Sequence, residues 1–207
     1  MCFLSSVSFA QKGFHFGIKY QPNISSVQNA NFADSTNLSL KNTFAQGGGV
    51  SLAFNVFDNL GVQAEALYSE QGQKFSGQDT AGKLYDSFLK LTYINVPLLI
   101  RLNSNTRKTV SFNITGGIQM GLLYGAGLVV TRVDGAQTTG VASTFKTVDM
   151  AVVYGGGFDI NLAEYFHINI GLRLSDGLVD IGKPGNEIFN STPTFNKNTS
   201  IYAGITF

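Results

Sequence analysis

The stretch TVSFNITGGIQMGLLY, residues 109–124, alternates between two kinds of side chain. Its even-numbered residues are apolar apart from one glycine: Val110, Phe112, Ile114, Gly116, Ile118, Met120, Leu122 and Tyr124. Its odd-numbered residues are small or polar, with Leu123 as the exception. Such alternation predicts a β-strand with one apolar and one polar face. An ordinary strand has about 5–6 residues, so this pattern indicates a sheet with unusually long strands.

Seven further segments repeat the alternation: FHFGIKY (14–20), GVSLAFNVF (49–57), LGVQAEALY (60–68), YINVPLLIRL (93–102), VDMAVVYGGGFDINL (148–162), FHINIGLRL (166–174) and SIYAGITF (200–207). A strand that crosses a bilayer at a tilt needs about 9–11 residues. In lipid every backbone N–H and C=O must be paired internally, so such a sheet must close. The sequence therefore predicts an all-β fold, an eight-stranded antiparallel transmembrane β-barrel. We expect the apolar face to contact lipid through Phe14, Val50, Phe112, Ile118, Ile168 and Ile205.

The connections between these segments alternate in length. Short links are expected at Asp58–Asn59, at Asn103–Lys108 and around Ala163–Glu164; long polar links are expected at Ser25–Thr43, Gln73–Ser87, Gly125–Thr147 and Asp176–Lys197. Outer-membrane barrels combine short periplasmic turns with long extracellular loops, so both termini are expected on the periplasmic side. A soluble ligand-binding barrel would instead need a charged outer face, whereas the polar face here is mostly Gly, Ser, Asn and Thr. The loops are dotted with Phe, which could bind partners or pack together.

The composition agrees with an apolar exterior. Of the 207 residues 43% are hydrophobic and only 13% charged, about half the charged fraction of soluble domains. The net charge of +1 gives no electrostatic footprint for nucleic acid. No run of 18 or more apolar residues exists, so a membrane-spanning helix is not expected.

The N-terminal segment MCFLSSVSFAQKG resembles the end of a secretory signal peptide, because Ser8 and Ala10 give the small-residue pattern of a cleavage site. We expect residues 1–10 to be a partial signal peptide and residues 11–207 to be an outer-membrane β-barrel domain. The alternative is a simple apolar tail. If residues 1–10 are removed, the remaining chain contains no cysteine, since Cys2 is the only one.

Three motifs carry a family resemblance: LTYINVPLLIR (91–101), VVYGGGFDINL (152–162) and the closing GITF. From about Gly13 to Phe207 the chain resembles the PorT-type outer-membrane β-barrel domains common in the Bacteroidota. The resemblance implies an OmpA-like eight-stranded barrel, surrounded by lipid, in the outer membrane of a Gram-negative cell. Members of this type include a component linked to a protein-secretion and gliding machinery. The terminal Phe207 resembles the signal that the barrel-assembly machinery reads.

Charged residues on the polar face are expected to form a network inside the lumen: His15, Lys19, Glu65, Arg101, Asp149, Asp159 and Arg173. Charges in a narrow barrel are unfavourable unless they are paired. The network is interpreted as a salt-bridged plug, with a gated ion path as the alternative. We expect Arg101 and Asp159 to pair across the lumen near the periplasmic turns, with His15 beside them.

Other features argue against an enzyme. The isolated His15 and His167 match no metal-binding motif, and Asn169 stands where lipid A deacylases carry the nucleophilic serine of a His-x-Ser pair. The glycine triplets at residues 47–49 and 155–157 lack the lysine of a phosphate-binding loop. Pro97 predicts a bulge or kink in the barrel wall. No catalytic residue, metal or cofactor is expected.

These observations favour a barrel with a structural or interaction role. Its lumen would be plugged by side chains, its long loops would be extracellular, and it would serve as an accessory to a secretion or envelope complex through a partner not yet known. The alternative is a porin-like channel for small solutes. Open porins usually have about 16–18 strands, whereas eight strands leave an interior that side chains can fill.

Overall fold

The computed structural model describes residues 13–29, 38–57, 59–78, 84–104, 108–132, 135–163, 166–185 and 192–207. The expected signal peptide, residues 1–10, lies outside the described residues, as does part of every expected turn and loop. Within the described ranges no helix has the length and apolar character needed to cross a membrane.

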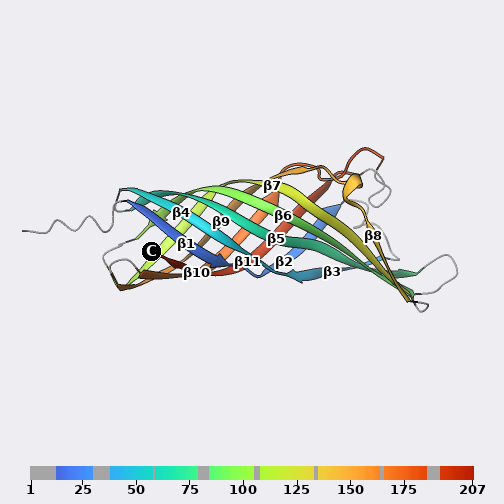
Figure 1. The fold of residues 1–207 in the computed structure, drawn as a ribbon, viewed down its shortest axis with the longest axis horizontal. Coiled ribbons are helices and arrows are strands. Elements are labelled where there is room, and N and C mark those ends of the chain that lie inside the picture. The colour runs from blue at the N-terminus through green and yellow to red at the C-terminus, as the bar shows by residue number, and fades with distance from the viewer. Residues whose placement is uncertain are drawn as a thin grey trace, which may run out of the picture.

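The described chain is almost entirely antiparallel sheet, with a single 3₁₀ turn (Figure 1). The elements are β1 (Phe14–Tyr20), β2 (Asn23–Asn29), β3 (Leu38–Ala45), β4 (Gly47–Phe57), β5 (Leu60–Gln78), β6 (Leu84–Asn103), β7 (Val110–Arg132), β8 (Gly135–Gly140), η1 (Ala142–Thr144), β9 (Val148–Ala163), β10 (Phe166–Gly177) and β11 (Thr194–Thr206).

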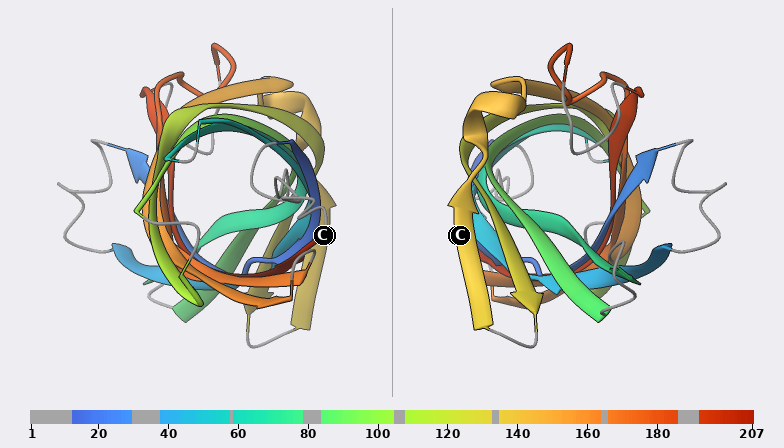
Figure 2. Two further views of the ribbon diagram at one scale, coloured as in Figure 1. Left: turned by 90° about the vertical axis from the view of Figure 1, so that its left-hand side faces the viewer. Right: turned by 90° about the vertical axis from the view of Figure 1, so that its right-hand side faces the viewer.

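These strands form a closed ring with eight strand positions, as the sequence predicted. The order around the ring is β1–β4–β5–β6–β7–β9–β10–β11, and β11 pairs back onto β1. β2 continues β1 beyond Pro22, and β3 leads into β4 at Gln46, so each pair fills one position in the ring. Pro22 has no N–H to offer the ladder, which explains the break between β1 and β2. Viewed along its axis, the barrel is a ring of strands (Figure 2).

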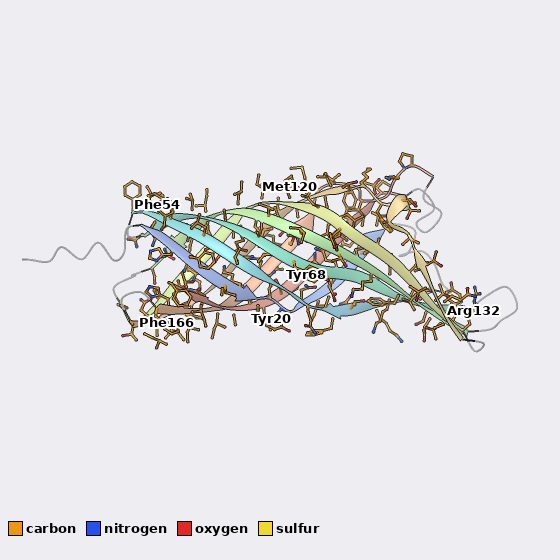
Figure 3. The ribbon with its side chains drawn as sticks, in the orientation of Figure 1. Tyr20, Phe54, Tyr68, Met120, Arg132 and Phe166 are labelled. Atoms are coloured by element: carbon orange, nitrogen blue, oxygen red, sulfur yellow. The ribbon has the colours of Figure 1, made fainter. Side chains whose placement is uncertain are left out.

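Apolar side chains cover the outside of the barrel and polar side chains fill its inside, the reverse of a soluble protein. Five of the six residues expected to face lipid are 40–73% exposed, namely Phe14, Val50, Phe112, Ile118 and Ile205; Ile168 is half-buried. On the opposite face Gln63, Glu65, Asn113 and Arg173 are buried. The predicted face assignment is confirmed. The side chains of Tyr20, Tyr68 and Met120 lie on the outside near the middle of the long axis (Figure 3).

Three pairs of phenylalanine rings lie at the end of the barrel that carries the C-terminus, here called the terminal end. Phe14 contacts Phe54 at a centroid distance of 4.9 Å, Phe112 contacts Phe158 at 5.6 Å, and Phe166 contacts Phe207 at 5.8 Å. Tyr20, Tyr68 and Tyr124 lie farther along the outer wall and are 44–80% exposed. Two aromatic girdles flanking an apolar band are typical of membrane-spanning barrels.

The long connections are shorter than expected, because the strands continue far past the apolar band. Residues 73–87 were expected as a loop, but β5 extends to Gln78 and β6 begins at Leu84. Residues 125–147 were also expected as a loop, but β7 extends to Arg132 and pairs with β8. This opposite end of the barrel, here called the hairpin end, extends well beyond the level of Tyr20 and Tyr68 in the girdle of tyrosines (Figure 3).

The hairpin end has an apolar interior. Its core consists of Val27, Phe75, Leu89, Leu91, Tyr93, Val141, Phe145 and Ile181, with Leu123, Ala126 and Leu128 packed against it. A register shift at Thr92/Tyr93 leaves Tyr124 as an extra residue on β7 and reverses the alternation beyond it. The inward positions are therefore Ala126 and Leu128 rather than odd-numbered residues. Most of these residues were expected to lie in loops, so the sequence analysis did not anticipate an apolar interior at this end.

Two strands separate at the hairpin end. β2 and β3 pair only from Asn23↔Ala45 to Ser25↔Thr43. Beyond this point β2 remains paired with β11, as it is along its whole length, and β3 pairs with β5. The side chain of Gln73 bridges the separation, because its Oε1 accepts the N–H of Val27 at 2.9 Å and its Nε2 donates to the carbonyl of Lys41 at 2.8 Å. One buried amide thus replaces a backbone pair between the two strands.

Pro97 does not form the predicted bulge. Its neighbours on β6 keep one register with β5, from Ala64↔Leu98 to Leu67↔Asn95. The two pairs between them are missing from the ladder, because Pro97 has no N–H to donate. The strand is interrupted without being shifted, and Pro97 itself is fully buried on the inner face.

Ile118→Lys should impair assembly much more than Gln119→Lys. Ile118 lies midway along the outer face of β7, where a lysine costs about 2–4 kcal/mol, whereas Gln119 points inward and is 8% exposed. The measurement is heat-modifiable gel mobility after folding into lipid vesicles. Equal loss of the folded band in both variants would mean that the faces are assigned wrongly.

Gln73→Leu should expose the separated strands to solvent exchange. We expect the amide proton of Val27 to exchange faster, because its acceptor is lost. The amide protons of the strands toward the terminal end should remain protected. Gln71→Leu is the matched control, since Gln71 is also buried on β5 but donates to Ser69 of its own strand. Hydrogen exchange followed by NMR measures the effect. Unchanged protection of Val27 would show that Gln73 does not join the strands.

Candidate functional site

A carboxylate in the middle of the barrel binds two cations, one from the opposite side of the ring and one from a strand two positions away. Glu65 on β5 accepts from Lys19 on β1, Nζ to Oε1, at 2.6 Å. Arg173 on β10 donates from both terminal nitrogens, with Nη2 at 2.9 Å from Oε1. Gln63 also donates to Glu65, and Gln21 accepts from Arg173 at 3.2 Å. The group Lys19, Glu65, Arg173 and Tyr202, here called the lumen plug, joins β1, β5, β10 and β11.

Tyr202 completes the lumen plug as an aromatic surface for the cations. Its ring centroid lies 5.0 Å from Nζ of Lys19 and 5.4 Å from Cζ of Arg173. The plug has two cations for one carboxylate, and the electron-rich face of Tyr202 partly compensates the extra positive charge. A Cβ at Gly171 would lie 2.5 Å from the Tyr202 hydroxyl, and one at Gly157 would lie 2.7 Å from it. Glycine at both positions therefore makes room for this ring.

The lumen plug is shielded from water. Arg173 is 2% exposed, Glu65 3% and Lys19 6%. Taking charges out of water is unfavourable unless geometry and additional hydrogen bonds compensate. Here the bidentate Arg173–Glu65 contact, the Lys19 ammonium and the Gln63 amide supply that compensation. The arrangement is suited to blocking the lumen at this level.

A second ion pair lies closer to the terminal end. Arg101 on β6 donates to Asp159 on β9, across the position of β7. Asn113 donates to the same carboxylate at 2.9 Å, and Asn169 also donates to it. Arg101 further donates to Asn103 at 2.9 Å. The structure thus brings together the two residues that the sequence analysis paired, within a set of amides that it did not anticipate.

His15 lies beside this pair and does not bridge it. Its Nε2 accepts from Asn55 at 3.3 Å, while Nδ1 of His167 donates to Asn161 at 2.8 Å. The two imidazole centroids are 6.1 Å apart. Both rings line a pocket of about 70 Å³ at the terminal end, together with Arg101, Ser111, Asp159 and Asn169. Among the described residues no hydrogen bond joins Ser111 to either histidine, so the hydroxyl has no adjacent base.

Asp149 stands apart from the other expected network residues. It is 6% exposed and accepts from Asn196 at 2.8 Å. Asn196 is also within 3.4 Å of the Tyr93 hydroxyl. Among the described residues no cation forms a salt bridge with Asp149, although the seven expected residues include three cations and three carboxylates. The seven expected residues therefore divide into the lumen plug, the terminal-end pair with His15, and Asp149.

A surface carboxylate ties two connections together at the hairpin end. Asp180 accepts the N–H of Thr194 at 2.9 Å and of Gly182 at 3.0 Å, and Lys146 lies 3.4 Å from its second oxygen. Partial burial opposes ionisation, but these two N–H groups and the Lys146 charge hold the pKa of Asp180 below its ordinary value. The link fixes the segment before β9 against the segment before β11.

Sequence reasoning missed the uncharged members of these clusters. Tyr202, Gln63 and Asn113 lie on the inward face of their strands, so the alternation alone would have placed them in the lumen. The pairing of Tyr202 with Gly157 and Gly171 depends on the cross-strand register Gly171↔Tyr202 and Gly171↔Gly157. A large inward residue opposite glycines on neighbouring strands is the signal that could have found it.

Residues 9–182 match the model of a family described as outer membrane protein beta-barrel domain. Among solved structures, the chain is similar to the outer membrane protein OprG from Pseudomonas aeruginosa, with 12% identity, a TM-score of 0.54, and coverage of 95% of this chain and 97% of that one. It is also similar to Neisserial surface protein A, with 10% identity, a TM-score of 0.49, and coverage of 94% and 96%. A third similar structure is Ail of Yersinia pestis, with 14% identity, a TM-score of 0.42, and coverage of 95% of this chain and 99% of that one. No curated protein matches the sequence.

Asp159→Ala should lower the free energy of unfolding by about 3–5 kcal/mol, because Arg101 is left as an unpaired charge in the lumen. Adding Arg101→Met should recover part of the loss, although Asn113 and Asn169 still lack their acceptor. Urea unfolding of the protein in lipid vesicles, analysed as a double-mutant cycle, gives the coupling energy. Additive losses would show that the two residues are not coupled.

The Asp180 link should be lost in acid. Because the pKa of Asp180 is lowered in the folded protein, the stabilisation is complete above the carboxyl's ordinary pKa of 3.8 and disappears as the pH falls through the lower folded value. We expect amide exchange at Gly182 and Thr194 to be unaffected by this carboxyl between about pH 5 and 8. Asp180→Asn should show fast exchange throughout. Faster amide exchange at Gly182 and Thr194 of the wild type near neutral pH would show that a group other than Asp180 controls this link.

Proposed function

The chain belongs to the family of outer membrane protein beta-barrel domains, and from this premise we propose that it is a closed barrel with a structural or interaction role. It lies in the outer membrane of a Gram-negative cell. The proposal is that the lumen conducts no solute, that no catalysis occurs in it, and that the barrel serves to hold its hairpin end in place.

The lumen plug is the observation that supports this proposal most strongly. Glu65 is bound by Arg173 across the lumen and by Lys19 from β1, two ring positions away, and all three are buried. The apolar core at the hairpin end, which includes Leu89 and Phe145, gives a second closed level. A solute would have to disrupt both levels to pass, so the porin-like channel is the weaker reading.

The pocket at the terminal end gives little support for an enzyme. His15 accepts from Asn55 and His167 donates to Asn161, so each imidazole has an amide partner. Asp159, which could orient a base, is engaged by Arg101 and two asparagines. We propose that these residues form structural hydrogen bonds that close the terminal end.

The orientation follows the pattern of outer-membrane barrels, with short turns in the periplasm and long hairpins outside. We propose that the terminal end is periplasmic and the hairpin end extracellular. The PorT-type resemblance supports a role as an accessory to a secretion or envelope complex, with a partner to be found by crosslinking in intact cells. Phe207 is proposed as the assembly signal; its backbone pairs with Phe16 at the closing seam, N–H to carbonyl, at 2.7 Å and 3.1 Å.

Planar-bilayer recording tests the closed lumen. The wild-type protein should give no steady conductance, because the lumen plug blocks the path. Replacing Lys19, Glu65 and Arg173 together by serine should produce conductance steps, while Lys183→Ser, in the exposed connection before β11, should behave like the wild type. Stable steps of one defined conductance in pure wild-type protein would overturn the proposal and favour the channel.

A further inference from the structure

We propose that the outer wall formed by β3, β5 and β6, just above the girdle of tyrosines, binds the phosphate group of an anionic lipid in the outer leaflet. The inference rests on the orientation proposed above, which puts the hairpin end outside the cell. It concerns the outer surface of the barrel and is independent of the lumen plug.

Lys41, Lys74 and Lys90 come together because of the strand register. Lys41 on β3 lies directly opposite Lys74 on β5. Lys74 lies opposite Phe88 on β6, and its ammonium is 5.6 Å from the centroid of that ring. Lys90 is two residues from Phe88 on the same face of β6. All three lysines are exposed.

Nearby carboxylates leave the Lys41–Lys74 pair without a counter-charge. Glu70 is occupied, because it accepts from Lys90 at 2.7 Å and from the Tyr68 hydroxyl at 3.0 Å. Asp86, one row farther from the girdle, forms no salt bridge with either lysine among the described residues. Like charges directly opposite each other in a sheet are destabilising. An anion between Lys41 and Lys74 would remove that repulsion.

Other lysines near the hairpin end contrast with this pair. Lys197 lies 3.4 Å from Asp176, and Lys146 lies 3.4 Å from Asp180. These cations are balanced within the protein, whereas Lys41 and Lys74 are not. Lys41 and Lys74 thus place two adjacent cations without a salt bridge, among the described residues, on one sector of the outer wall, and an anionic headgroup is their electrostatic complement.

An apolar hollow beside the lysines fits the rest of a lipid. It measures about 340 Å³ and its lining includes Tyr68, Phe88, Lys90, Tyr124, Gly125 and Gly127. A Cβ at Gly125 or Gly127 would contact nothing within 4 Å, so the glycines leave this space open. Tyrosines at one side and lysine at the other match an amphiphile whose acyl chain runs toward the apolar band and whose phosphate lies above it.

The position along the barrel agrees with a headgroup. On the outer wall, Tyr68 and Ile94 are exposed on the side of the lysines that faces the terminal end. Toward the hairpin end the wall becomes polar, with Lys41, Lys74 and Ser76. Tyrosines at a membrane interface mark the headgroup level. Figure 3 shows Tyr68 on the outside of the cylinder, on the side of the molecule where β3, β5 and β6 continue toward the hairpin end.

Binding of phosphorylated lipid A to the purified barrel in zwitterionic detergent, measured by native mass spectrometry, tests the proposal. Lys41→Gln with Lys74→Gln should weaken binding about 30-fold, since each lysine near an anionic surface contributes about a fivefold change in affinity. Lys183→Gln with Lys197→Gln changes the charge equally and should leave binding unchanged. Dephosphorylated lipid A should bind the wild type as weakly as the phosphorylated lipid binds the double variant.

Three outcomes would overturn the lipid site: equal binding by the Lys41/Lys74 variant, equal binding of dephosphorylated lipid A, or displacement of the lipid by inorganic phosphate at a similar concentration. The last result would indicate a site for free phosphate. Heat-modifiable mobility of each variant shows that it is folded. Because protein in micelles has no sidedness, a failure here is separate from a failure of the proposed orientation, which surface labelling of cells addresses.

Discussion

Closure of the sheet between β1 and β11 is the constraint on which the rest of the structure depends. Backbone groups in lipid have no water to bind, so the first and last strands must pair, and they do so through Gly17–Tyr20 and Ala203–Thr206. Closure with eight strands fixes a narrow lumen, and a narrow lumen must be filled. The apolar face then lies outward, and the polar face of each strand supplies the filling.

The side chains that fill the lumen change in character along the barrel axis, because the outer wall faces lipid in one part and water in another. Within the apolar band the filling is made of charges and amides, with Glu65 bound to Lys19 and Arg173 and with Asp159 bound to Arg101. Beyond the band the wall extends into water, and the interior becomes an ordinary apolar core around Leu89 and Phe145. At the same level β2 and β3 separate, and the amide of Gln73 joins them.

The band could be predicted from the sequence because alternation is a local property that survives as long as the register is regular. It holds on β7 from Val110 to Leu122 and ends at Tyr124, where a register shift relative to β6 reverses the two faces. The shift lies in the pairing of two strands, so the sequence of β7 alone carried no sign of it. The Arg101–Asp159 contact could be predicted from the sequence because both residues face inward and lie near turns. The position of Tyr202 beside Gly171 could not be predicted, because it depends on the register between strands.

The closed lumen requires that Glu65 is ion-paired with Arg173 while the protein spans a bilayer. The most direct measurement is a solid-state NMR distance between the Glu65 carboxyl carbon and the Arg173 guanidinium nitrogens in lipid bilayers, with Glu65→Gln used to assign the signal. We expect a strong dipolar coupling, as required by the Nη2–Oε1 contact of 2.9 Å. A folded barrel in which these nuclei show no coupling would contradict it.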